Sequence, residues 1–268
     1  MDEAERRLQK KHLEILVRNG GFQFTDTFFP YTSGEIGPYY VQSAVVMNNG
    51  GDYYTSCKDI ENLIVGCEWE GGSFYVVSGG ESRDWIFSLP IALELGKPHT
   101  MIYKDGKMIG ADVKGRRVVH VADLNNEGSS PRDKWVPAIR KAGGKITDIF
   151  FYVDRMEEGV KVMQELGLRR HAVVELDYQA WDYLKTQGVV TEEVYKNLIE
   201  RGTSKESRDA WAINMLQCEK GLGTLGKLFV GSKSDREKAH KIINHYNYLC
   251  IIDLVERLNK RGYRISAP

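Results

Sequence analysis

The sequence predicts an α/β fold: a mostly parallel β-sheet flanked by helices, with a small N-terminal hairpin and an α-helical C-terminal extension. Two observations lead to this prediction. Short apolar segments alternate with helical ones between residues 55 and 176, which is typical of βαβ units. From residue 178 onward only helical patterns follow. We therefore expect an α/β domain over residues 1–177 and a helical extension over residues 178–268.

The N-terminal part of the chain predicts a helix and then a hairpin. Ala4, Leu8 and Ile15 share one face of a helix over residues 2–19, and two glycines end it. Aromatic residues then flank the turn Ser33-Gly34, which favours a hairpin outside the main sheet. The other elements expected in this domain are helices over residues 55–65, 88–95 and 157–166 and strands over residues 74–77, 99–103, 118–121, 145–153 and 172–176.

The C-terminal extension is expected to contain helices over residues 178–186, 191–201, 207–220 and 234–261. Between the last two lies the glycine-rich segment 221–227, which fits a dinucleotide fingerprint and most of a P-loop. No strand precedes it, and Leu228 stands where a P-loop needs Ser or Thr. We therefore expect a plain connector there, with no nucleotide role.

The composition limits the classes of function. Lysine plus arginine and aspartate plus glutamate both number 37, so the net charge is zero and no nucleic-acid partner is indicated. The four cysteines form no C-x-x-C pair and the six histidines form no metal-spaced cluster, so we predict no metal site. The N-terminus does not resemble a signal peptide, and no segment is long and apolar enough to span a membrane. These features favour a cytoplasmic protein with reduced thiols and no membrane partner.

The polar turn after the apolar strand at residues 118–121 indicates an anion site. Asp123 follows the strand, and the segment 125–130 contains asparagine, glycine and serine residues. Pro131 is expected at the first helical position, with Ser130 as N-cap and Asp133 as the acid of a capping box. A turn of this kind directs backbone N–H groups and hydroxyls at a phosphate. An ordinary βα turn uses the same residues, so the residues alone leave both interpretations open.

This stretch resembles the phosphoribosyl pyrophosphate (PRPP) motif of the type I phosphoribosyltransferases, in which an apolar strand leads through two adjacent acids into a turn of small residues. Residues 8–177 resemble the orotate phosphoribosyltransferases in the order and spacing of their segments. The resemblance implies a type I phosphoribosyltransferase fold, a homodimer and a small phosphoribosyl or nucleotide ligand. It also implies transfer of phosphoribosyl from PRPP to orotate or a related base in pyrimidine nucleotide metabolism, with Mg²⁺ carried by PRPP.

The same resemblance implies a set of site residues. They are Asp123, Lys104 and Lys107 as catalytic residues; Asn126, Gly128, Ser129 and Ser130 at the 5′-phosphate; Ser78, Gly79, Gly80, Ser82 and Arg83 at the pyrophosphate; and Arg155 and Tyr39 at the base. Two of these segments have a second interpretation. Residues 104–107 read equally as the tip of a β-hairpin, and Arg155 could form a surface pair with Asp154.

Several positions depart from the family pattern. Ala122 replaces the first of the two acids, Thr32 and Tyr103 replace basic residues, Glu35 and Glu127 add negative charge, and the loop after Lys104 is short. Glu81 and Asp84 also place negative charge beside the predicted pyrophosphate segment. Because a closing loop normally excludes water and brings charge to the transition state, we expect weak or altered activity. The alternative is a regulatory protein that binds a nucleotide or PRPP without turnover.

Overall fold

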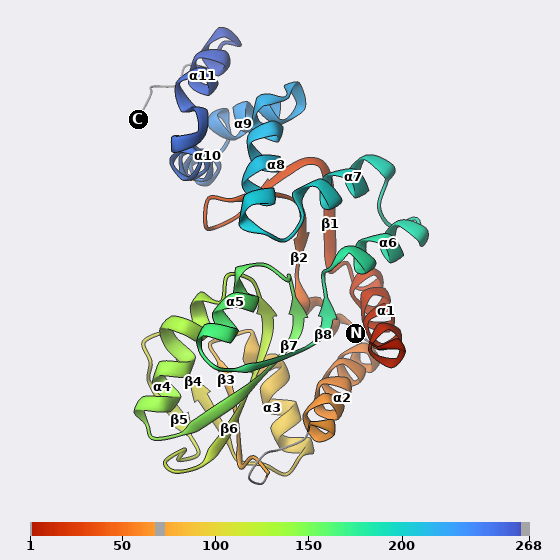
Figure 1. The fold of residues 1–268 in the computed structure, drawn as a ribbon, viewed down its shortest axis with the longest axis vertical. Helices are drawn as coiled ribbons and strands as arrows, with labels where there is room; N and C mark the ends of the chain where they lie inside the picture. The colour runs from red at the N-terminus through yellow and green to blue at the C-terminus, as the bar shows by residue number, and fades with distance from the viewer. Residues whose placement is uncertain (1, 68–72, 264–268) are drawn as a thin grey trace. The chain divides into compact units, whose positions relative to one another are not determined.

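The computed structural model describes residues 2–67 and 73–263, and only the backbone of residues 247–253. The chain divides into two compact units, coloured by residue number in Figure 1. Unit 1 consists of Met1–Gly21 and Gln42–Tyr183, and unit 2 of Phe22–Val41 and Leu184–Pro268. The N-terminal hairpin thus groups with the C-terminal helices, whereas the sequence placed it in the α/β domain.

Unit 1 is built on a six-stranded sheet in the order β5-β4-β3-β6-β7-β8 (Figure 1). The strands are β3 (Val76–Gly80), β4 (His99–Ile102), β5 (Met108–Gly110), β6 (Arg117–Asn125), β7 (Lys145–Asp154) and β8 (Arg169–Glu175). Every neighbouring pair is parallel except β4 with β5. The predicted mostly parallel sheet is confirmed. Five strands therefore end at one edge, where ligands bind in sheets of this kind.

Helices cover both faces of this sheet (Figure 1). One face carries α1 (Glu3–Arg18), α2 (Gly50–Gly66) and α3 (Asp84–Glu94), and the other carries η2 (Pro131–Trp135), α4 (Val136–Lys141) and α5 (Glu158–Glu165). The strand β7 shows why two layers form: Tyr152 packs on Phe87 of α3, while Phe151 belongs to the cluster with Ile139 of α4. Successive strand residues face opposite sides, so a fully apolar strand needs cover on both.

Three helix starts differ from the predicted ones. The helix α2 begins at Gly50, because the Asn49 side chain accepts the N–H groups of Gly51 and Asp52. The helix α3 begins at Asp84, four residues before the predicted start. The predicted capping box at Ser130 is wrong, because Ser130 is itself helical and makes no capping bond. The helix there begins at Ser129, before the predicted start, and continues through the π-helical turn η2. Asp133 pairs with Arg132 instead of capping the helix.

Unit 2 combines a hairpin with a helical bundle. The antiparallel strands β1 (Phe22–Pro30) and β2 (Ile36–Val41) confirm the predicted hairpin. The helices of the bundle are α7 (Glu192–Arg201), α8 (Lys205–Gln217), α9 (Glu219–Val230), α10 (Lys233–His245) and α11 (Asn247–Lys260). Two further helices, η1 (Ser43–Asn48) and α6 (Tyr178–Thr186), lie at the two ends of the second segment of unit 1. Phe28 and Ile36 of the hairpin enter the apolar core that these helices form, which explains the grouping.

Two predictions for the extension are wrong. The segment 221–227 is helical, as part of α9, and is not a connector. Its glycines allow close packing, because a Cβ on Gly221 would overlap the Met215 backbone and one on Gly226 would overlap the Tyr263 ring. The predicted long helix over 234–261 is two helices, α10 and α11, separated at Tyr246. None of the helices in the described part of the chain has the length and apolarity that a membrane crossing requires.

Candidate functional site

Hydrogen bonds join the segments that follow the parallel strands of unit 1. After β3, the Glu81 N–H donates to the Ile102 carbonyl at 2.8 Å, and the Glu81 carboxylate accepts the Lys104 N–H at 2.9 Å. On the other side, the Arg155 N–H donates to the Asn125 carbonyl at 3.0 Å. The segments 81–83, 103–107, 125–130 and 155–157 therefore lie along one edge of the sheet. The parallel arrangement predicted from the sequence brings them there.

Asp123 lies at the carboxyl end of β6 and is held from two sides. The Ser43 hydroxyl in η1 donates to Asp123 Oδ2 at 2.8 Å, and Arg83 Nε lies 3.8 Å from the same oxygen. Asp123 is 7% exposed and Ser43 is 1% exposed. Burial, and next the Asp84 carboxylate, raise the pKa of Asp123 to about 7, against the opposing effects of Arg83 and Ser43. Asp123 is thus a buried carboxyl group with only a small exposed fraction.

Asp84 is the acid that the sequence placed beside the pyrophosphate segment. Its side chain points inward and is 2% exposed. Its Oδ1 accepts the Asp123 N–H and its Oδ2 accepts the Gly80 N–H, each at 3.0 Å. Burial raises the pKa of Asp84 to about 7, although these N–H groups oppose the rise. The carboxylate therefore links the end of β3 to the end of β6, and does not face a ligand directly.

A buried histidine completes this linkage. His120 Nδ1 lies 2.9 Å from Ser78 Oγ, and His120 Nε2 lies 3.6 Å from Asp84 Oδ2. Burial lowers the pKa of His120 to about 3, so the ring is neutral beside Asp84. Trp135 of η2 stacks on the ring with centroids 4.6 Å apart. The row Ser78–His120–Asp84 is fully enclosed, so it supports the sheet edge and offers no nucleophile to a substrate.

The predicted pyrophosphate segment is only partly a loop. Ser78, Gly79 and Gly80 belong to β3 and are buried. A Cβ on Gly79 would overlap Ser88, and a Cβ on Gly80 would overlap Trp135, so these glycines serve packing. The three residues are enclosed in β3, and their predicted contact with a diphosphate stays a prediction. Ser82 and Arg83 are exposed beyond the strand and keep the predicted role as a proposal.

The turn predicted to hold a phosphate depends on glycine at position 128. Gly128 has a φ of +70°, and a Cβ there would lie 2.8 Å from the Val162 Cβ, so only glycine fits. Asn126 and Ser130 are half-buried and Ser129 is exposed. The sequence did not identify Asn125, whose Nδ2 donates to Asp154 Oδ2 at 2.9 Å and fixes the start of the turn. Phosphate binding by the four predicted residues remains a proposal.

Lys104 and Lys107 lie on a hairpin tip between β4 and β5. The Lys107 N–H donates to Asp105 Oδ1 at 2.9 Å, and Gly106 has a φ of +84°. The hairpin interpretation of this segment is therefore confirmed. Both lysine side chains are exposed. The Lys104 backbone bond to Glu81 keeps this tip beside the segment that contains Arg83.

Arg155 is buried, with 6% exposure, and is not a surface residue. Its guanidinium pairs with Glu157 at 3.0 Å, and the two side chains are 7% and 1% exposed. Asp154 does not pair with it, since that carboxylate accepts from Arg170 and Asn125. The surface-pair interpretation is therefore wrong. Glu157, which no sequence pattern indicated, accepts a hydrogen bond from one nitrogen, Nη2, of the guanidinium that was predicted to bind a base.

Tyr39 and Glu35 lie in unit 2. Tyr39 is 2% exposed and its carbonyl accepts the Tyr31 hydroxyl at 2.5 Å. Glu35 is also buried, 3.3 Å from Arg208 and 4.0 Å from Arg201. The added negative charge of Glu35 is thus compensated inside unit 2. The ring of Tyr39 is enclosed there, so its predicted contact with a base has no support within this unit and stays a prediction.

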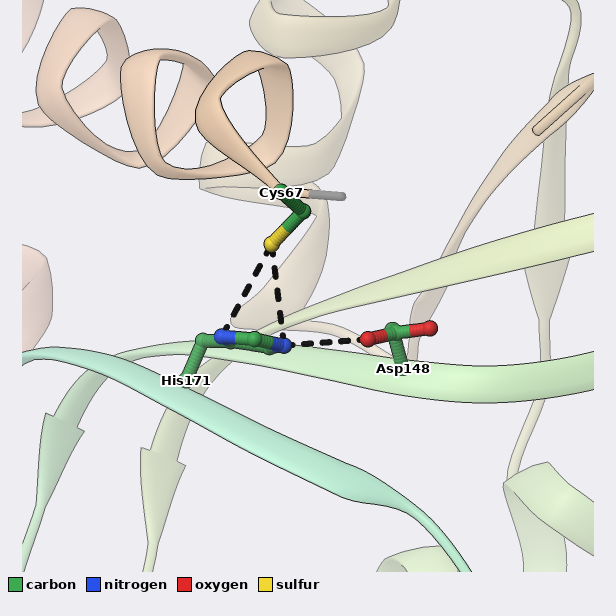
Figure 2. A group of neighbouring side chains, drawn as sticks. All are labelled: Cys67, Asp148 and His171. Carbon is green, nitrogen blue, oxygen red and sulfur yellow. Dashed lines mark hydrogen bonds and ion pairs between the residues drawn. The ribbon is translucent and has the colours of Figure 1, made fainter. Parts of the chain in front are cut away.

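In the described part of the chain, one group of side chains is close enough to share a metal ion: Cys67, Asp148 and His171. Figure 2 shows Cys67 at the end of α2 reaching toward the His171 ring, which points at Asp148. The sulfur lies 3.8 and 3.7 Å from the two ring nitrogens, and His171 Nε2 lies 3.0 Å from Asp148 Oδ1. Arg169 binds both carboxylate oxygens of Asp148, at 2.8 and 3.0 Å. A second cation would have to compete with this guanidinium, so we assign no metal role to the group.

No protein-family model matches the chain, but individual proteins do. An orotate phosphoribosyltransferase from Methanopyrus kandleri is 36% identical over 170 residues, which cover 61% of this chain and 87% of that protein. One from Sulfolobus acidocaldarius is 30% identical over 147 residues, which cover 53% of this chain and 72% of that protein.

A solved structure gives the same result for the fold. The orotate phosphoribosyltransferase of Francisella tularensis superposes with a TM-score of 0.58 at 18% identity, over 71% of this chain and 96% of that one. The structural match agrees with the mostly parallel sheet of unit 1. The chain therefore belongs to the orotate phosphoribosyltransferase family.

Proposed function

We propose that the chain binds Mg²⁺–PRPP at the carboxyl edge of the unit 1 sheet and transfers phosphoribosyl slowly to orotate or a related carboxylate-bearing base. The observation that carries the proposal is the position of Asp123. Ser43 and the Asp84 contact hold it at the end of β6, directly before the left-handed turn at Gly128. A carboxylate beside an anion-binding turn suits a sugar that carries both hydroxyls and a phosphate.

Each group has a defined part in this proposal. Asp123 accepts the ribose hydroxyls, and the N–H groups and hydroxyls at Asn126, Gly128, Ser129 and Ser130 hold the 5′-phosphate. Ser82, Arg83 and the lysines 104 and 107 face the pyrophosphate as it leaves. The reaction breaks the C1–O bond to pyrophosphate and forms a C1–N bond to the base. Its cation-like transition state depends on positioning and charge, and needs no protein nucleophile.

Three features support slow transfer. The turn at residues 103–107 is a tight hairpin tip, so it is too short to cover a site and exclude water. Arg155 is already paired with Glu157, so a carboxylate of the base must displace a buried partner. Asp123 is buried beside the Asp84 carboxyl group and is therefore partly protonated near neutral pH. Each feature weakens either the charge stabilisation or the substrate contacts.

Calorimetric titration with Mg²⁺–PRPP tests the binding part. We expect Asp123→Asn to reduce affinity about 10- to 100-fold, because a hydrogen bond to a charged group contributes about 1.5–3 kcal/mol. The control is Asp133→Asn, which removes an exposed carboxylate paired with Arg132. Equal affinity of wild type and Asp123→Asn would place the ligand elsewhere. Consumption of orotate in the presence of Mg²⁺–PRPP then measures transfer.

The second candidate is a non-catalytic protein that binds PRPP or a nucleotide for regulation. The buried Arg155–Glu157 pair favours it, because the Glu157 carboxylate balances the charge of the guanidinium that is predicted to bind a base. Tight PRPP binding without any pyrophosphate release would select this alternative. Measurable pyrophosphate release that depends on orotate would exclude it.

We also propose that the chain forms a homodimer in the cytoplasm. Family membership supports the dimer, and the free thiols of Cys57, Cys67 and Cys218 fit a reducing compartment. Sedimentation equilibrium of the full chain tests the assembly, and a mass of one chain across the concentration range would refute it.

A further inference from the structure

Two buried carboxyl groups, Asp84 and Asp123, meet where β3 and β6 end, and the proposed phosphoribosyl transfer uses only Asp123. We propose that Asp84 is a positioning residue for Asp123: it fixes the Asp123 main chain and shares one proton with the Asp123 carboxyl group, which sets the pH range in which the site accepts ribose hydroxyls. The inference rests on the proposed binding of PRPP. Its first part, the carboxyl pair, can be tested without any ligand.

The main-chain contacts give Asp84 its positioning role. One carboxylate oxygen accepts the Asp123 N–H and the other accepts the Gly80 N–H. An asparagine has only one side-chain oxygen, so it could keep only one of these bonds. Gly80 precedes the segment that contains Arg83, and Asp123 precedes the Gly128 turn. A carboxylate at residue 84 thus sets the spacing between the two halves of the proposed site.

The charges around the pair explain the shared proton. Asp84 faces the Gly80 N–H of β3, the Asp123 N–H and the neutral His120 ring of β6. Asp123 faces the Ser43 hydroxyl of η1 and the guanidinium of Arg83, whose side chain is 54% exposed. One solvated guanidinium at 3.8 Å cannot balance two enclosed negative charges. The pair therefore keeps a proton until the pH is high enough to remove it.

Both carboxyl groups have donors for their charged forms: two N–H groups at Asp84, and the Ser43 hydroxyl and the Arg83 guanidinium at Asp123. The remaining proton therefore belongs to the pair, and Asp123 carries it for part of the time. A protonated Asp123 is a poorer acceptor for ribose hydroxyls than the carboxylate. PRPP binding should therefore strengthen as the pH rises through neutrality, in proportion to the ionised fraction of Asp123.

Titration of the ligand-free protein tests the pair directly. Carboxyl chemical shifts of ¹³C-labelled aspartate are followed from pH 4 to 9 in wild type, Asp84→Asn and Asp123→Asn. We expect two late-titrating aspartates in wild type, and a lower midpoint, by roughly one pH unit, for the single one that each variant retains. Two aspartates that titrate independently, with unchanged midpoints in the variants, would overturn the inference. Because either variant suffices, a folding failure in one leaves the test intact.

The pH profile of Mg²⁺–PRPP binding tests the second part. We expect Asp84→Asn to move the midpoint of the profile to lower pH by roughly one unit, because the like charge that raises the Asp123 midpoint is gone. Asp133→Asn is the control. The PRPP phosphate titrates near pH 6 in every variant, so its contribution cancels when the profiles of two variants are compared. A weaker but unshifted profile in Asp84→Asn would overturn the proton-sharing role. Absence of binding at every pH in wild type would refute the proposed function, while the ligand-free titration still decides whether the pair exists.

Discussion

The bond between Ser43 and Asp123 leads to a prediction with a distinctive pH dependence. The Ser43 hydroxyl donates to Asp123 Oδ2 at 2.8 Å, and the two residues are 1% and 7% exposed. Water has little access to replace the hydroxyl, so Ser43→Ala leaves a buried carboxylate oxygen without this donor. We expect a loss of about 1.5–3 kcal/mol of unfolding free energy when Asp123 is charged, and about 1 kcal/mol when it is neutral.

The pH dependence follows from the protonation of Asp123. Since the Ser43 bond lowers the pKa of Asp123, the folded variant has a higher pKa for this group than folded wild type, while the unfolded chains titrate alike. The two proteins therefore differ least at pH 5.5, where Asp123 is protonated in both. The difference grows as the pH passes the wild-type value of about 7, and it is largest at pH 8.5.

Urea denaturation at pH 5.5 and 8.5 measures this difference. The control is Ser56→Ala: that serine is fully buried and donates to the Asp52 carbonyl at 2.8 Å, so its loss should not vary with pH in this range. A loss for Ser43→Ala that is equal at the two pH values would refute the reasoning. It would mean that Asp123 stays in one protonation state throughout, or that the hydroxyl does not bind the carboxylate.

Two further predictions follow from the site. Glu157→Gln should increase the affinity for orotate about tenfold in calorimetric titration and should lower the melting temperature. The reason for both is that it removes the negative charge 3.0 Å from the Arg155 guanidinium. Unchanged orotate binding would exclude Arg155 as the base contact. Gly128→Ala should cost about 2–5 kcal/mol in urea denaturation, since it adds left-handed strain to overlap with Val162. Gly167 also has a positive φ, +67°, but open space around it, so Gly167→Ala should reduce the free energy of unfolding by only about 1–2 kcal/mol. Equal losses for the two variants would disprove the argument that Gly128 is required for packing.

Local errors in the sequence prediction have a common cause. The segment Ser78-Gly79-Gly80 looks like a loop because glycine pairs usually follow strands, yet it is buried strand. The segment 221–227 looks like a connector for the same reason, yet it is helix. In both segments the glycines make room for side chains from elsewhere, including Ser88, Trp135 and Tyr263. The sequence shows where each glycine is, but not which side chain packs against it in the fold.

The sequence by itself determined that the sheet is mostly parallel and that Asp123 precedes a turn of small polar residues, because periodicity and turn chemistry are properties of adjacent residues. Only the tertiary structure decided what surrounds that carboxylate. Ser43 lies 80 residues from Asp123 and Asp84 lies 39 residues from it, and neither contact leaves a local pattern. The charge state of the site depends on these distant groups and on burial, since a pKa responds to the three-dimensional surroundings of a group and not to its neighbours along the chain.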